Sequence, residues 1–300
     1  MNRSIAIGYG FLVVSILMWS GNAVIARAAM LADVPPITFN FIRWSAACLI
    51  FLPFSARGVW RHRRIFIEKW RYFAAMGLAS VTCFNTFFYI GLKSTTAIQG
   101  SLIQSILPVL VLILMVTVLR ERINGLQVMG VVLSILGAAI ILMRGDPEVA
   151  LSLQLNIGDL WCLAAVFFWA IQLMLLRWKP PQIAMPEFMT VLIAWGVVLM
   201  IPGLIWEIST GQKLVLNSTN LMFLAYVAVV ASVFGTTLFN SGVIRVGPAT
   251  SGYFGNLYPV FAAVLAVLLL GEKFEWFHGL GGALVLGGIY FATMARRKTQ

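Results

Sequence analysis

Long apolar runs, separated by short polar or turn-forming breaks, fill almost the whole chain. A helix needs roughly 20 mostly apolar residues to cross the hydrocarbon core of a bilayer, and the runs have about that length. The pattern therefore predicts an all-α polytopic membrane protein. Ten transmembrane helices are expected, near residues 5–28, 37–55, 71–91, 96–119, 124–143, 157–177, 184–206, 219–242, 248–270 and 276–295.

The composition supports a membrane location. Of the 300 residues, 61% are hydrophobic and 10% are charged, and the mean hydropathy is +0.94. Ordinary soluble domains contain roughly 25% charged residues. The connections are short apart from residues 56–70, so function is expected between the helices. The net charge of +11 does not indicate nucleic acid binding, because the basic residues are not on a folded soluble surface.

The basic residues collect on one side of the expected helices. If the N-terminus is cytoplasmic, fifteen of the 21 basic residues fall at inside positions and five at outside positions, with Arg43 inside a span. The positive-inside rule therefore predicts a multi-pass protein of the cell (inner) membrane with both termini in the cytoplasm. A cleaved signal peptide is the alternative interpretation of the first segment, which however also belongs to an internal repeat.

The second half of the chain repeats the first at an offset of 150 to 151 residues. Chance does not align tryptophans, prolines, glycines and a carboxylate in this way. Five helices per half is an odd number, so the halves 1–149 and 150–300 are expected to be inserted with opposite orientations around a central cavity. Inverted repeats of this kind are typical of transporters that work by alternating access. The aligned pairs include Trp19 with Trp169, Phe88 with Phe239, Pro108 with Pro259, Glu121 with Glu272, and Gly130 with Gly281.

The paired carboxylates Glu121 and Glu272 fall in turns between the fourth and fifth helix of each half. One interpretation is that they anchor the chain at the membrane surface and end helices. The other is that they act as a gate or a coupling site. The sequence favours the first.

Two motifs carry a resemblance to a known family. The stretches "LMWSGNAVIARAA" and "NFIRWSAACLIF" are followed by Pro-Val, an apolar run, a glutamate and a glycine at helical spacing, and the Pro-Val to Glu to Gly pattern occurs in both halves. The whole chain resembles the EamA-type family of the drug/metabolite transporter superfamily. Within it, the aromatic-rich first helices are similar to those of bacterial aromatic amino acid exporters. The resemblance implies ten helices in two inverted halves and export from the cytoplasm.

A tryptophan followed three residues later by an amide occurs in the first helix of each half, as Trp19 with Asn22 and Trp169 with Gln172. An indole ring offers a flat apolar wall, and an amide offers both a donor and an acceptor. These pairs suit an amphipathic, zwitterionic or aromatic solute. The alternative is that the tryptophans lie at the membrane interface and the amides bind neighbouring helices.

Other polar residues fall at membrane depth and are further candidates for substrate binding. Asn85 and Tyr89 match Thr236 and Asn240 in the repeat, and both pairs are spaced to share one helix face. Two prolines free a backbone carbonyl and allow a kink that would serve as a hinge or a cavity wall; the alternative is that they are ordinary prolines tolerated in membrane helices. The remaining candidates are Gln104 and Asn256 for binding, and Pro108 and Pro259 for the kinks.

Arg43 is the one clear asymmetry between the halves, because Ile193 takes its place in the repeat. It is expected about 9 Å below the outer surface, six residues into its helix. A buried guanidinium needs an acidic partner, several carbonyls or a ligand carboxylate. Snorkelling to the surface and a structural pairing are the alternatives to a substrate role.

Small residues at four-residue spacing mark the fifth and tenth helices, as Gly130, Ser134 and Ala138 and as Gly279, Ala283 and Gly287. They are interpreted as packing faces within or between protomers. All ten acidic residues and both histidines lie at or near expected helix ends, and no metal or phosphate-binding motif is present. We therefore expect no enzymatic activity and no cofactor.

The sequence as a whole predicts a secondary transporter that exports small metabolites, foremost amino acids with a preference for aromatic or hydrophobic ones. With no carboxylate or histidine expected at the midplane, uniport or facilitated exchange is favoured over proton coupling. The expected partners are a small-molecule substrate and the lipid bilayer, with no nucleic acid; the oligomeric state is open, a monomer included. The alternatives are a multidrug, sugar or lipid-linked metabolite carrier, or a non-transporting membrane interaction protein.

Overall fold

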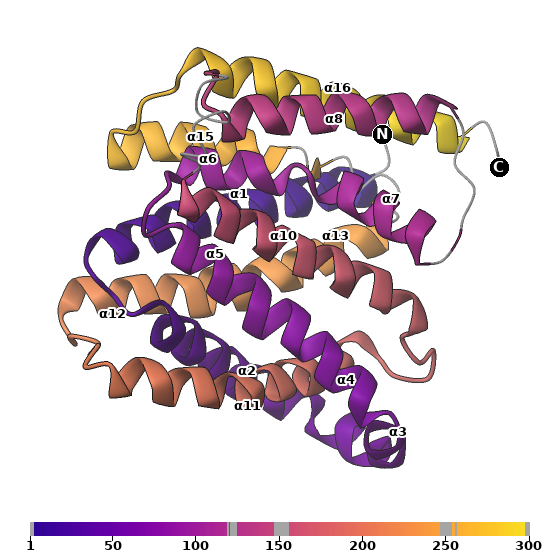
Figure 1. The fold of residues 1–300 in the computed structure, drawn as a ribbon. Coiled ribbons are helices and arrows are strands. Elements are labelled where there is room, and N and C mark those ends of the chain that lie inside the picture. The colour runs from indigo at the N-terminus through magenta and orange to yellow at the C-terminus, as the bar shows by residue number, and fades with distance from the viewer. Residues whose placement is uncertain are drawn as a thin grey trace.

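The computed structural model of the protein describes residues 3–118, 120, 125–146, 156–246, 254–255 and 257–297. Every regular element in this part of the chain is helical, and the long helices run roughly along one direction (Figure 1). The elements are α1 (Arg3–Leu31), α2 (Pro36–Arg61), α3 (Arg63–Glu68), α4 (Trp70–Gly77), η1 (Leu78–Phe84), α5 (Asn85–Gly91), α6 (Ala97–Gln104), α7 (Leu107–Thr117), α8 (Gly125–Leu142), α10 (Ile157–Leu175), η2 (Leu176–Trp178), α11 (Met185–Ser209), α12 (Ser218–Ala225), η3 (Tyr226–Gly235), α13 (Thr236–Val246), α15 (Leu257–Leu270) and α16 (Trp276–Arg297).

Seven helical runs in the described residues are long and apolar enough to cross a membrane. Two shorter apolar helices lie at Val128–Ile141 and Leu257–Leu270. This confirms the predicted all-helical, multi-pass membrane architecture, whereas the number of ten crossings and the inverted repeat stay predictions. The seven runs are Ile5–Leu31, Pro36–Arg61, Trp70–Gly91, Ala97–Leu114, Ile157–Trp178, Met185–Ser209 and Ser218–Val246.

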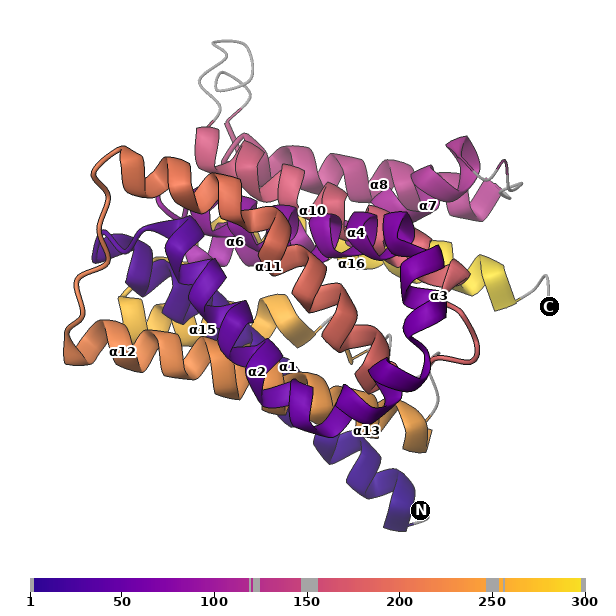
Figure 2. The same ribbon diagram turned by 90° about the horizontal axis from the view of Figure 1, so that it is seen from below.

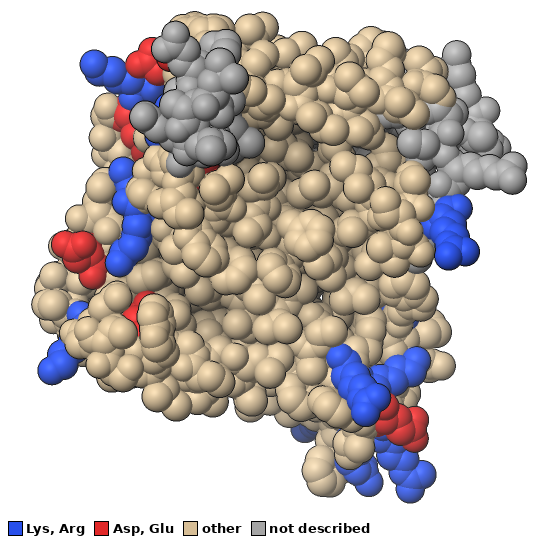
Figure 3. Space-filling model, in the orientation of Figure 1, with Lys and Arg blue, Asp and Glu red and all other residues tan. Residues whose placement is uncertain are grey.

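The helices connect at two opposite ends of the bundle. We call the end that holds residues 32–35, 92–96, 210–217 and 271–275 the Glu272 end, and the opposite end, which holds Arg3 and residues 62–69, the N-terminal end. Lysine, arginine and acidic side chains lie along these two ends on the face seen in Figure 3, with uncharged surface between them. A belt of uncharged surface between two charged ends is what a protein needs in order to sit in a bilayer.

Two of the long helical runs contain a π-helical segment. In η1 and η3, the backbone ladder shifts to i→i+5 bonds, and the side chains of Asn85 and Ser232 donate to the carbonyls five residues back, at 2.8 Å in both cases. Neighbouring helices bind other carbonyls of these segments: Trp19 Nε1 donates to Ala231 O at 3.0 Å, and Asn40 Nδ2 to Val81 O at 2.9 Å. π-segments occur frequently at functional sites.

Two pairs of helices from opposite halves of the sequence pack side by side. α2 lies along α11, as Figure 2 shows, and α8 lies along α16. Small residues allow the second pair to approach closely, because a Cβ at Gly288 would lie 2.4 Å from the Gly130 carbonyl and 2.2 Å from Ser134 Oγ. Gly137 likewise faces the backbone of Gly281. The predicted packing face of α8 is therefore confirmed.

The predicted packing face of α16 does not meet another helix within the described part of the chain, and packing between protomers stays a prediction. Gly287 has no neighbour within 4 Å of an added Cβ, and at Gly279 such a Cβ meets Phe274 alone, at 3.6 Å. The face that meets α8 instead carries Gly281 and Gly288. The helix is rich in glycine on more than one face, so spacing within its own sequence does not identify the face that the neighbour contacts.

We predict that Gly288→Ala destabilises the protein and that its neighbour Gly287→Ala does not. The methyl group at 288 collides with backbone on α8, which should cost about 1–3 kcal/mol, whereas the change at 287 should stay within about 0.5 kcal/mol or stabilise the helix. Thermal unfolding of the two purified variants in one detergent measures this. Equal melting temperatures would contradict the α8–α16 contact.

Candidate functional site

Arg43 lies on α2 and is 5% exposed. Its Nε donates to Ser232 Oγ of η3 at 2.7 Å, and its Nη1 donates to Asn85 Oδ1 at 3.0 Å and to the Tyr89 hydroxyl. The Tyr89 hydroxyl in turn donates to Asn22 Oδ1 of α1 at 3.2 Å. The side chains of α1, α2, α5 and η3 therefore meet at one guanidinium.

Every hydrogen-bond partner of Arg43 among the described residues is electrically neutral. Aromatic rings add further contacts: the guanidinium carbon lies 4.8 Å from the centre of the Trp44 ring and 5.9 Å from that of Tyr89. Cation–π contacts and neutral acceptors stabilise a buried cation without neutralising it. The geometry leaves the site able to attract an anion.

Two tryptophan–phenylalanine pairs flank this site in closely similar geometries. The Trp19 ring lies 4.8 Å from Phe239 at an interplanar angle of 37°, and the Trp169 ring lies 4.8 Å from Phe84 at 36°. In each pair the tryptophan and the phenylalanine come from different halves of the sequence. The two helices that carry these tryptophans, α1 and α10, are therefore each joined to the opposite half by an aromatic contact.

The other predicted site residues are distributed around these contacts. Gln104 Nε2 donates to the Tyr258 hydroxyl at 3.1 Å. Gln172 and Asn240 are half-buried, and Asn256 lies outside the described residues. The helical run that contains Gln104 is interrupted at residues 105–106, directly before Pro108, whereas Pro259 lies in the first turn of α15.

Two carboxylates cap helices rather than pair with cations. Glu272 accepts the first backbone N–H groups of α6, from Ala97 at 2.8 Å and Ile98 at 3.0 Å. Glu207 does the same at the start of α2, from Ile37 at 2.9 Å and Thr38 at 2.7 Å. Both stabilise helix N-termini, where N–H groups lack partners within the helix. Glu121, the repeat partner of Glu272, lies outside the described residues.

A second polar cluster, which the sequence did not reveal, lies at the Glu272 end. Asp159 accepts from the Thr95 hydroxyl and, at 3.2 Å, from Gln99 Nε2. The side-chain oxygen of Gln99, Oε1, lies 3.2 Å from Nε2 of His278. His278 Nδ1 accepts a hydrogen bond from the Glu275 backbone N–H at 3.0 Å. Because Nδ1 is an acceptor, His278 is neutral and its Nε2 is the donor. The cluster joins α6, α10 and α16.

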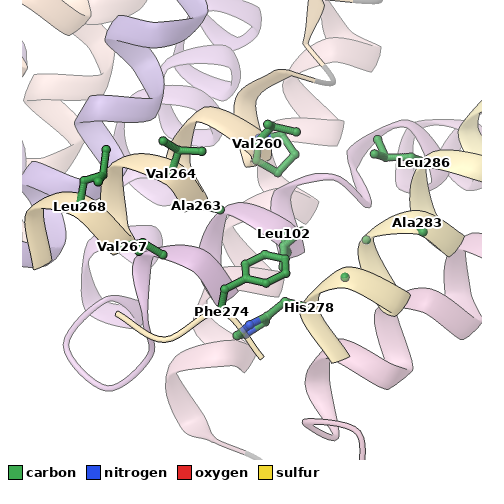
Figure 4. A pocket seen from close by; sticks show the side chains of 13 residues that line it. Leu102, Val260, Ala263, Val264, Val267, Leu268, Phe274, His278, Ala283 and Leu286 are labelled. Atoms are coloured by element: carbon green, nitrogen blue, oxygen red, sulfur yellow. The ribbon is translucent and has the colours of Figure 1, made fainter. Parts of the chain in front are cut away.

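A groove of about 560 Å³ runs between α15 and α16 on the outside of the bundle (Figure 4). Its lining is apolar except for His278 at one end, and it includes Gly279 and Ala283, which were expected to pack against another helix. Val264 and Leu268 on its rim are 52% and 73% exposed. The groove therefore faces the bilayer and is separate from Arg43.

Three residues in the network around Arg43 were not among the predicted site residues, namely Ser232, Trp44 and Phe39. Ser232 is a polar residue at depth in the eighth expected helix, which is a weak signal that could have been followed. Trp44 and Phe39 carry no comparable signal, because aromatic residues are common throughout the chain.

We predict that Glu272→Gln lowers stability and leaves transport in place. An amide offers one acceptor oxygen without charge to two N–H groups, so unfolding should become easier by about 1–2 kcal/mol. Glu275→Gln is the matched control, because Glu275 is exposed and should change stability by less than about 0.5 kcal/mol. Loss of transport at unchanged melting temperature would show instead that Glu272 is a gate.

Comparison with known proteins places the whole chain among transporters. The EamA-like transporter family matches residues 6–143 and 156–294. An uncharacterized transporter of Archaeoglobus fulgidus is 24% identical over 94% of this chain and 96% of its own length. The uncharacterized transporter YetK of Bacillus subtilis is 28% identical over 73% of this chain and 66% of its own length. A solved structure, described only as that of a protein, has a TM-score of 0.60 at 18% identity, covers all of both chains and shows similarity of fold alone.

Proposed function

The chain belongs to the EamA-like transporter family, and we propose that it exports amino acids, with a preference for aromatic and hydrophobic ones, by uniport or facilitated exchange. Two inverted five-helix halves, residues 1–149 and 150–300, would open alternately to the two sides of the cell membrane, with both termini in the cytoplasm. The binding site lies between the halves, as is usual for transporters built from inverted repeats.

The observation that carries this proposal is the buried Arg43 guanidinium with neutral partners. A guanidinium recognises a carboxylate through charge-assisted hydrogen bonds, and every amino acid offers a carboxylate. Arg43 also takes partners from both halves, Asn85 from the first and Ser232 from the second. A solute bound at Arg43 would therefore lie next to residues of both halves, so its affinity would depend on how the two halves are positioned.

The aromatic pairs support the preference for aromatic solutes and the mode of movement. Trp19 with Phe239 and Trp169 with Phe84 are interfaces that alternate opening of the halves would break and remake in turn. The π-segments η1 and η3 lie beside them, and a wider, less regular helix ladder is a natural place for bending. The prolines Pro108 and Pro259 are proposed as further hinges.

We predict that Trp169→Ala reduces kcat/KM for tryptophan and phenylalanine export at least about tenfold, because it removes an aromatic wall worth more than about 1.4 kcal/mol. Flux of radiolabelled tryptophan, phenylalanine, threonine and a sugar in proteoliposomes measures this. Trp206→Ala, which changes a side chain 61% exposed on α11, is the matched control and should transport normally. Equal loss in both variants would argue against a binding role for Trp169.

We also predict that an imposed pH gradient does not drive accumulation of substrate. The carboxylates and histidines of the described residues lie toward the ends of the helices, as caps, ion pairs or the Asp159 cluster, and none contacts Arg43. Proteoliposomes with an acidic interior and those with an alkaline interior should therefore reach the same final concentration of phenylalanine inside as outside. Accumulation against its gradient, driven by the pH difference alone, would show proton coupling.

A further inference from the structure

We propose that the Arg43 site selects solutes by net charge, so that aromatic monocarboxylates without an ammonium group are its preferred cargo and the membrane potential drives their export. This inference rests on the proposed function and makes its substrate class more specific. Amino acids share the carboxylate and would be the weaker members of the class.

The site carries one positive charge that its described surroundings do not neutralise. Arg43 stays protonated in proteins, and its described partners are a serine, an asparagine and a tyrosine. Its Nη2 makes no hydrogen bond within the described part of the chain. Arg43 is 5% exposed, and Nη2 is not among its fully enclosed atoms, so a carboxylate that reached Nη2 would supply both an acceptor and the missing negative charge.

An ammonium group finds no carboxylate beside this guanidinium among the described residues. The amide oxygens there are neutral acceptors: Asn85 Oδ1 accepts from Arg43, Asn22 Oδ1 accepts from Tyr89, and the buried Asn40 Oδ1 on α2 has no hydrogen-bond partner in the described chain. Glu207, on the helix beside α2, is occupied by the first N–H groups of α2. A zwitterion would therefore satisfy Arg43 with its carboxylate while its ammonium lost water without gaining an anion in return.

An aromatic group attached to the carboxylate has a surface to contact. Asn22 and Trp19 are three residues apart on α1 and so lie on neighbouring positions of one helix face. The network around Arg43 therefore leads along α1 to the Trp19–Phe239 pair. Flat rings of this kind bind phenyl and indole groups whatever the charge of the rest of the solute.

Carrying a monoanion makes transport depend on voltage. Each elementary charge that crosses a potential of 100 mV corresponds to about 2.3 kcal/mol, which is roughly a 50-fold concentration ratio. Cells are negative inside, so an anion uniporter exports its cargo without a coupling ion, in whichever orientation the carrier is inserted. This agrees with the absence of carboxylates and histidines among the described neighbours of Arg43.

Three compounds that share a phenylethyl frame test the charge selection: 3-phenylpropionate is an anion, phenylalanine a zwitterion and 2-phenylethylamine a cation. Calorimetry on the full chain in detergent should show that phenylpropionate binds at least about tenfold more tightly than phenylalanine and that the amine does not bind. Arg43→Gln should weaken phenylpropionate binding at least about tenfold, and Arg43→Lys should weaken it less. Arg245→Gln, an exposed arginine on α13, is the control and should bind as the wild type does.

Currents on solid-supported membranes test the charge that is carried. A concentration jump of phenylpropionate should give a saturable current with the sign of a moving negative charge, and phenylalanine should move without current. Leakage of the protonated acid through lipid carries no charge and does not interfere. The wild-type comparison of the three compounds needs no variant, so it stands even if Arg43→Gln does not fold.

The two proposals fail in different ways. Saturable phenylalanine flux with binding equal to or tighter than that of phenylpropionate, or a phenylpropionate flux without current, overturns the charge selection and leaves amino acid export standing. No saturable binding or flux for any of the three compounds overturns both.

Discussion

A buried positive charge without a carboxylate partner is the constraint on which the account of this protein depends. Taking a guanidinium out of water costs several kcal/mol, and neutral acceptors recover only part of that cost. The chain accepts it at Arg43, where Asn85 and Tyr89 of α5 converge with Ser232 of η3. The same residues would hold a solute carboxylate between the two halves. Burial of the cation thus lowers the stability of the fold at the site where, in the proposed function, an anion binds.

α2, which carries Arg43, is held by its neighbours, and two irregular helical segments lie beside it. α2 is fixed at its start by the Glu207 cap and along its length by α11. Its polar neighbours come from η1, α5 and η3, where the helix ladder widens. At the Glu272 end, the cap on α6 and the cluster of Asp159, Gln99 and His278 tie further helices together. Fixed ends and an irregular middle are consistent with alternating access.

Much of the fold could be predicted from the sequence, because an apolar run of membrane-spanning length has few ways other than a helix to satisfy its backbone hydrogen bonds in a bilayer. Their polarity at membrane depth singled out Arg43, Asn85 and Tyr89 as separate candidates, and the structure shows that they are in contact. Ser232 was missed because it lies 189 residues from Arg43 in the chain, so local spacing carries no information about the contact. On α16 the small residues that meet α8 are not the set that the spacing selected, because two sets of small residues lie on different faces and the choice depends on α8. The binding roles of Trp19 and Trp169 stay predictions.

The most direct test of the account is an experimental structure of the protein with a bound 3-(4-iodophenyl)propionate, whose iodine and carboxylate can be located independently. The account predicts a carboxylate oxygen within hydrogen-bond distance, about 3 Å, of the Arg43 guanidinium, with the ring toward Trp19 and Phe239. Iodine in the lipid-facing groove between α15 and α16, with no ligand at Arg43, would contradict it.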